Sequence, residues 1–81
     1  MSVIKPGQLR AWDFSSHSSM LHHLQGQMFL VLDRFEYPFE RYKDRHEVRW
    51  HYIDFEREEV MWRDEDSLVR FSVVLTEMQN D

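Results

Sequence analysis

Hydrophobic and polar side chains alternate in the middle of the chain, which is the pattern of strands that bury one face. The clearest case is residues 47–55, where Val48, Trp50 and Tyr52 share one face of an extended strand. Residues 28–32 form a continuous apolar run that is too short for a typical helix and predicts a strand buried on both faces. The centre of the chain is therefore predicted to be β-structure.

The two ends of the chain also carry strand patterns. Residues 9–12 alternate directly after the Pro6-Gly7 pair, which is a turn signal. Residues 69–75 alternate as well, and their β-branched valines favour a strand, although residues 68–78 also fit helical spacing. We therefore expect a first strand near the start of the chain and a last strand near its end.

Polar stretches separate these strands. Residues 13–19 are a serine-rich loop, and residues 37–46 are a charged loop in which Pro38 keeps the chain out of the sheet. Residues 56–58 form the tip of a hairpin that returns through a fourth strand at residues 59–63; the tip lacks Gly and Asn, which favours a longer loop on type I geometry. The acidic residues that follow predict a single helical turn before the last strand.

Length and composition limit the classes of protein that fit. With 81 residues there is room for one domain spanning residues 1–81, with an ordered core at about residues 4–76. The absence of cysteine excludes disulfides and thiolate metal sites, and a net charge of −5 argues against a nucleic-acid-binding surface. No apolar run approaches the roughly 20 residues that span a bilayer, and no secretion signal is evident. We expect a cytoplasmic protein that does not contact a membrane.

Five short strands in so short a chain predict an all-β fold, namely a small five-stranded antiparallel barrel with one short helical turn before the last strand. This pattern resembles an SH3-like barrel. More narrowly, KPGQLRAW, GQMFLVL and a Trp-centred hairpin ending in DEDSL are similar to small SH3-like barrel proteins encoded by tailed bacteriophages. The chain departs from that pattern at the hairpin tip, where ERE replaces a glycine-containing turn.

The resemblance implies a role in binding rather than in catalysis. It points to an accessory protein in the host cytoplasm that binds and modulates a host protein, with a virion or assembly component as the alternative. A nucleic-acid-binding barrel is disfavoured by the negative charge. A monomer or a weak homo-oligomer is expected.

The chain contains little that indicates catalysis or a bound cofactor. His17, His22 and His23 form the best candidate metal cluster, but their spacing does not place two of them on one helical face, so we interpret them as loop histidines. His51 and Asp54 lie on opposite faces of their predicted strand and cannot act as a pair. No nucleophile or phosphate-binding motif is present. We therefore expect no enzyme activity, no cofactor and no metal.

Aromatic and acidic residues are the best candidates for a binding surface. Aromatic and arginine side chains are typical interface anchors, and acidic ones favour basic partners. The alternatives are that the aromatic rings cap the barrel and that the acids form a solvated edge. The predicted core rings are Phe29, Trp50, Trp62 and Phe71. The predicted partner-binding residues are Tyr37, Phe39, Arg41, Tyr42, Glu56 and Glu58.

Overall fold

Five strands and one short helix make up most of the protein in a computed structural model that describes residues 3–15, 22–38 and 46–77. A single 3₁₀ turn, His22–Leu24, lies between the first two strands. The elements in chain order are β1 (Gln8–Trp12), β2 (Met28–Pro38), β3 (His46–Asp54), β4 (Glu59–Asp64), α1 (Glu65–Phe71) and β5 (Ser72–Glu77).

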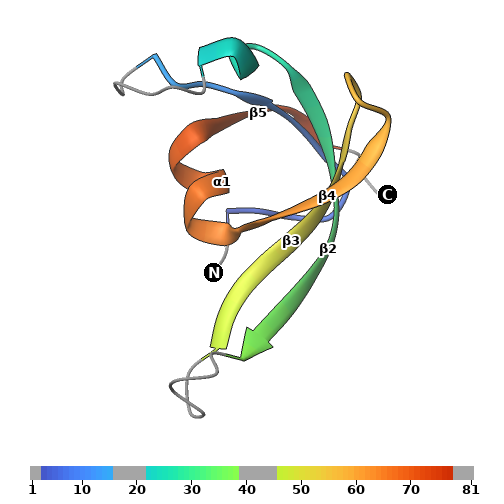
Figure 1. Cartoon of the computed structure of the whole chain (residues 1–81), viewed down its shortest axis with the longest axis vertical. Helices are drawn as coiled ribbons and strands as arrows, with labels where there is room; N and C mark the ends of the chain where they lie inside the picture. The colour runs from blue at the N-terminus through green and yellow to red at the C-terminus, as the bar shows by residue number, and fades with distance from the viewer. Residues whose placement is uncertain (1–2, 16–21, 39–45, 78–81) are drawn as a thin grey trace.

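The strands form one antiparallel sheet in the order β4-β3-β2-β1-β5 (Figure 1). The predicted all-β fold with five antiparallel strands and a short helix before the last strand is confirmed. Among the described residues β4 and β5 are not paired with each other, so the sheet is not closed. Helix α1 contacts both of these strands and lies on the concave side of the bent sheet (Figure 1).

Strands β2 and β3 form the longest pair of the sheet. Their register runs from Phe29 opposite Asp54 to Pro38 opposite His46, with an irregularity between Val31 and Arg34 that bends the pair. The prediction that a loop begins at Tyr37 is wrong, because β2 continues to Pro38. Proline is tolerated at the end of a strand, where no further ladder hydrogen bond needs its missing N–H.

The core lies on the face of the sheet that α1 covers, which we call the inner face. Trp12 contacts Phe29 with ring centroids 4.5 Å apart, and Phe29 contacts Tyr52 at 4.8 Å. Trp50 is also buried, and its indole N–H donates to the Glu65 carboxylate at 2.8 Å. The buried hydrophobic cluster consists of Ile4, Trp12, Phe14, Leu24, Phe29, Val31, Trp50, Tyr52 and Leu68.

The predicted core rings have mixed outcomes. Phe29 and Trp50 are buried, and Phe71 is half-buried and packs against the core cluster, as predicted. The assignment of Trp62 to the core is wrong, because 51% of this residue is exposed on the opposite face of the sheet. The prediction that residues 28–32 are buried on both faces is also wrong: Met28 is exposed, and only alternate residues of this run are buried.

The boundary between the helix and the last strand differs from the prediction. Residues 69–71 belong to α1 rather than to β5, and the helix has seven residues instead of a single turn. Asp64 caps its N-terminus by accepting a hydrogen bond from the Ser67 backbone N–H, and Leu68 is fully buried. Burial of Leu68 therefore outweighs the strand propensity of the valine that follows it.

The hairpin between β3 and β4 has a four-residue loop, as its lack of glycine predicted. The buried Asp54 carboxylate accepts hydrogen bonds from the backbone N–H groups of Glu56 and Arg57 at 2.9 and 3.1 Å. Glu58 takes the left-handed backbone conformation (φ 56°) that glycine usually occupies in such loops. The Asp54 side chain thus organises the turn in place of a glycine-containing sequence.

Candidate functional site

The side of β2, β3 and β4 that faces away from the core carries a group of large side chains, which we call the outer face. Strand alternation and register bring them together: His51 pairs with Trp62, Ile53 with Val60, and Phe35 with Arg49. Val60, Trp62 and Tyr37 are each about half-exposed or more. The outer face consists of Phe35 and Tyr37 from β2, Arg49, His51 and Ile53 from β3, and Val60 and Trp62 from β4.

Arg49 lies between two aromatic rings at the centre of the outer face. Its guanidinium carbon is 4.1 Å from the centroid of Tyr37 and 4.0 Å from that of Trp62. The Glu47 carboxylate holds the same guanidinium by an ion pair of 2.7 Å. A cation over an aromatic ring is attracted by the negative electrostatic potential at the face of the ring. The contacts with Arg49 thus restrict both rings, which stay about half-exposed to solvent.

A second aromatic contact lies beside this stack. The rings of Phe35 and His51 are stacked with centroids 4.4 Å apart. A His51 ring nitrogen is 3.1 Å from the carboxylate of Asp33, which comes from the irregular part of β2. The sequence pattern correctly predicts that His51 and Asp54 point to different faces of β3. It does not predict the contact of His51 with Asp33, because that contact depends on the irregularity in β2.

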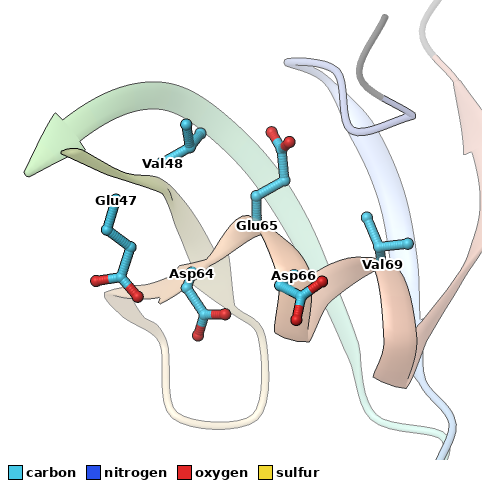
Figure 2. Close-up of a pocket in the computed structure, with 6 residues that line it drawn as sticks. All are labelled: Glu47, Val48, Asp64, Glu65, Asp66 and Val69. Carbon is cyan, nitrogen blue, oxygen red and sulfur yellow. The ribbon is translucent and has the colours of Figure 1, made fainter. Parts of the chain in front are cut away.

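Next to the stack, an acidic pocket of about 420 Å³ opens between the sheet and α1. In Figure 2 the carboxylates of Glu47, Asp64 and Asp66 point to the same side, while Glu65 points the other way. The lining residues are Glu47, Val48, Asp64, Glu65, Asp66 and Val69.

The acids of this pocket also have structural partners. Glu65 accepts from Trp50, and Asp66 forms an exposed ion pair of 3.3 Å with Arg70. Partial burial by itself raises the pKa of Asp64, but hydrogen bonds from the hydroxyl and backbone N–H of Ser67 outweigh it, so the net pKa lies below its usual value. Asp64 is therefore held in the charged form at neutral pH. The pocket presents a negative potential and a small apolar floor.

The histidine cluster proposed from the sequence is only partly described. His17 lies outside the described residues, and only the backbone of His22 is described. His23 is exposed, and its carbonyl accepts a hydrogen bond from the Gln27 side chain at 3.3 Å. Within the described ranges no group of three His, Cys, Asp or Glu residues is placed to hold a metal ion.

Three of the six predicted partner-binding residues lie in the described part of the chain, and these three are not brought together. Tyr37 lies on the outer face, whereas Glu56 and Glu58 are exposed at the β3–β4 hairpin. Strand β3, which has nine residues and is about 30 Å long at roughly 3.3 Å per residue, separates the two groups. Phe39, Arg41 and Tyr42 lie outside the described residues.

Sequence reasoning missed Arg49 and Trp62 as members of the candidate site. The necessary signal was present. Alternation along residues 47–55 puts Arg49 on the face of the strand that does not carry Trp50, and alternation along β4 puts Val60 and Trp62 on one face. What misled the prediction was the assumption that a tryptophan in a small sheet belongs to the core.

The chain matches no protein-family model, no curated protein and no solved structure. The resemblance to bacteriophage SH3-like barrels therefore stays a prediction from the sequence. Among the helices in the described part of the chain, none is both long and apolar enough to cross a membrane.

Proposed function

We propose that this chain is a small SH3-like domain that binds, without catalysis, a segment of another protein carrying basic side chains. The observation that carries the proposal is the Tyr37–Arg49–Trp62 stack on the outer face, with its half-exposed tryptophan. The order of the five antiparallel strands and the short helix before β5 support the SH3-like part. Exposed aromatic rings fixed in place are typical anchors of protein interfaces.

The ordering of the rings favours recognition of a partner over a purely structural role. Trp62 adds little to the core, since its ring lies on the side of the sheet opposite to α1. Arg49 restricts the ring before any partner arrives, so less side-chain entropy is lost on binding. Val60 and Ile53 extend the apolar surface along β4 and β3.

Charge selects the class of partner. The acidic pocket adjoins the stack through Glu47, which contacts Arg49 and also lines the pocket. A lysine or arginine of the partner placed in this pocket would meet several carboxylates while neighbouring apolar side chains cover Trp62. Such complementarity speeds association and excludes acidic partners. The same negative charge repels nucleic-acid phosphates.

Selection from a display library of random peptides tests the proposal. Panning on the wild-type chain should enrich peptides that combine lysine or arginine with aromatic or aliphatic residues. Trp62→Ala should weaken the binding of a selected peptide by about thirtyfold, corresponding to roughly 2 kcal/mol. High salt should weaken the wild-type complex as well, because charge contributes to it.

Phe55→Ala is the matched control, because Phe55 is an exposed aromatic residue at the hairpin away from the stack. It should leave peptide binding unchanged. Equal losses for the two variants, enrichment of acidic peptides, or retention of single-stranded DNA at low salt would each contradict the proposal.

A further inference from the structure

Strand β4 is an edge strand whose centre is apolar and exposed. Among the described residues it pairs only with β3, and its other side is the end of the sheet. Val60 and Trp62 are exposed by 62% and 51%. The charge of Arg63 is directed to the inner face, where its guanidinium carbon is 5.3 Å from the centroid of Trp12. The centre of this edge therefore lacks the charge or proline that commonly protects natural edge strands from pairing.

The hydrogen bonds of β3 show which backbone groups of β4 point outward. The Phe55 N–H donates to the Met28 carbonyl at 3.5 Å, so the backbone groups of Phe55 face β2. Because successive residues of an antiparallel strand alternate in direction, the backbone groups of Tyr52, three residues earlier, face β4. Tyr52 is paired with Met61, whose backbone groups therefore face β3. The N–H and carbonyl groups of the two residues that flank Met61, which carry the exposed side chains, point toward the open edge.

The regular register of β4 distinguishes it from β5, the edge strand at the other end of the sheet. The pairing of β5 with β1 skips Leu75, whereas the pairing of β4 with β3 is continuous from Asp64 opposite Arg49 to Glu59 opposite Asp54. An added strand needs outward N–H and carbonyl groups at regular intervals, and an irregularity interrupts them. Strand β4 is therefore the better template for a further strand.

The acidic pocket lies at the end of this edge. Asp64 is the last residue of β4, and it lines the pocket together with Glu47. Side chains two residues apart on a strand share a face, so Val60, Trp62 and Asp64 all lie on the outer face. A strand added beside β4 would thus meet two apolar side chains and then carboxylates at the same two-residue spacing. This charge complementarity specifies a basic side chain at one end of the added strand.

We infer that the basic segment of the partner binds in an extended conformation, as an additional strand antiparallel to β4. The inference rests on the proposed function, because it specifies the conformation and register of the segment proposed there. Antiparallel pairing continues the arrangement of the other strands. Main-chain hydrogen bonds then contribute affinity, and alternate side chains contribute specificity. The segment carries lysine or arginine opposite Asp64, followed at two-residue intervals by apolar residues opposite Trp62 and Val60.

Titration of the full chain with the acetylated and amidated peptide Ser-Lys-Thr-Val-Thr-Val-Ser tests the inference. In the register above its lysine lies opposite Asp64, and its two valines lie opposite Trp62 and Val60. Peptide concentrations up to about 5 mM detect a Kd of about 1 mM. Amide hydrogen exchange is followed residue by residue. The N–H groups of Val60 and Trp62 should gain protection when the peptide binds, whereas the Met61 N–H, which already faces β3, should not change.

Two N-methylated peptides form a matched pair. N-methylation of the first valine removes the N–H that would donate to the Trp62 carbonyl, and it should weaken binding by about tenfold or more. N-methylation of the threonine between the valines changes an N–H that points away from β4, and it should leave the Kd within about twofold. A third peptide, with glutamate in place of lysine, should also bind about tenfold more weakly, because its carboxylate would meet that of Asp64.

Equal affinities of the two N-methylated peptides overturn the inference but leave the proposed function intact, since side chains alone would then account for binding. The same holds if the parent peptide does not bind while peptides selected from the display library do. If no basic peptide binds, the proposed function fails and the inference fails with it. A glutamate peptide that binds as tightly as the parent overturns the register that places the basic residue opposite Asp64.

Discussion

The inner and outer faces of the sheet both carry large aromatic rings, but the rings have different neighbours. On the inner face Trp12, Phe29 and Tyr52 contact one another and are almost completely buried. On the outer face the Tyr37 and Trp62 rings each pack against the guanidinium of Arg49. The inner rings exclude water, and the outer rings stay in contact with it.

This difference shows that a high content of aromatic residues in a small domain does not mean that all of them are buried. A ring among other rings gains stability from removing apolar area from water, at roughly 25 cal/mol per Å². A half-exposed ring over a guanidinium gains much less, and its position is fixed by charge rather than by packing density. The inner face therefore accounts for stability, and the outer face is the one available for recognition.

Trp50→Ala is expected to have the largest effect and would test the inner half of this comparison. The ring is buried and its indole N–H bonds Glu65, so its removal should lower the free energy of unfolding by about 3–5 kcal/mol. Urea unfolding followed by circular dichroism measures the change. Trp62→Ala, which removes an indole ring of the same size from the outer face, should lower the free energy of unfolding far less. Equal losses would show that the two faces do not differ as described.

Much of the fold follows from the sequence because alternation of side chains is a local property. Residues 47–55 place Val48, Trp50 and Tyr52 on one face, and the structure has these residues packed in or against the core. The end of β2 at Pro38 and the helical state of residues 69–71 could not be predicted in this way. They depend on pairing with β3 and on burial of Leu68, which are contacts between distant parts of the chain.

The candidate site was less predictable than the fold. Aromatic composition pointed to Tyr37, but the stack also needs Arg49 and Trp62, which come from two other strands. Their approach depends on the register of β2, β3 and β4, and an irregularity in β2 shifts that register. A single sequence shows which residues alternate, but it does not show which residues of neighbouring strands lie side by side.

Asp64→Ala should have an intermediate effect, at the junction where β4 leaves the sheet and α1 begins. Loss of an N-cap typically costs about 1 kcal/mol of stability. Because the folded-state pKa is lowered, the contribution of Asp64 is fully present above its unfolded-state pKa of about 3.9 and is lost as the pH falls through the lower folded-state value. The variant should therefore lose stability at neutral pH, and the loss should disappear once the pH has fallen below the lowered folded-state pKa of Asp64. Thermal unfolding at a series of pH values measures this dependence.

Asp66→Ala is the matched control for that prediction. Asp66 also lies in the first turn of α1, but its ion pair with Arg70 is exposed and does not cap the helix. The control should change stability by only a few tenths of a kcal/mol. A pH dependence of the same size in both variants would mean that the negative charge of the first helical turn, rather than the hydrogen bonds of the Asp64 cap, stabilises α1.

The smallest expected effect concerns the outer face itself. A double-mutant cycle of Arg49→Ala and Trp62→Ala should give a coupling of about 0.5–1 kcal/mol, the value for a cation–π contact at an exposed site. A cycle of Arg49→Ala with Phe55→Ala, two residues with no shared contact, should give no coupling within error. The coupling should persist at high salt, because a ring has no net charge to screen, whereas an ion pair between exposed groups is weakened. If Arg49 and Trp62 prove independent, the guanidinium is held by Glu47 and Tyr37 without Trp62, and the Trp62 ring is exposed without being ordered for a partner.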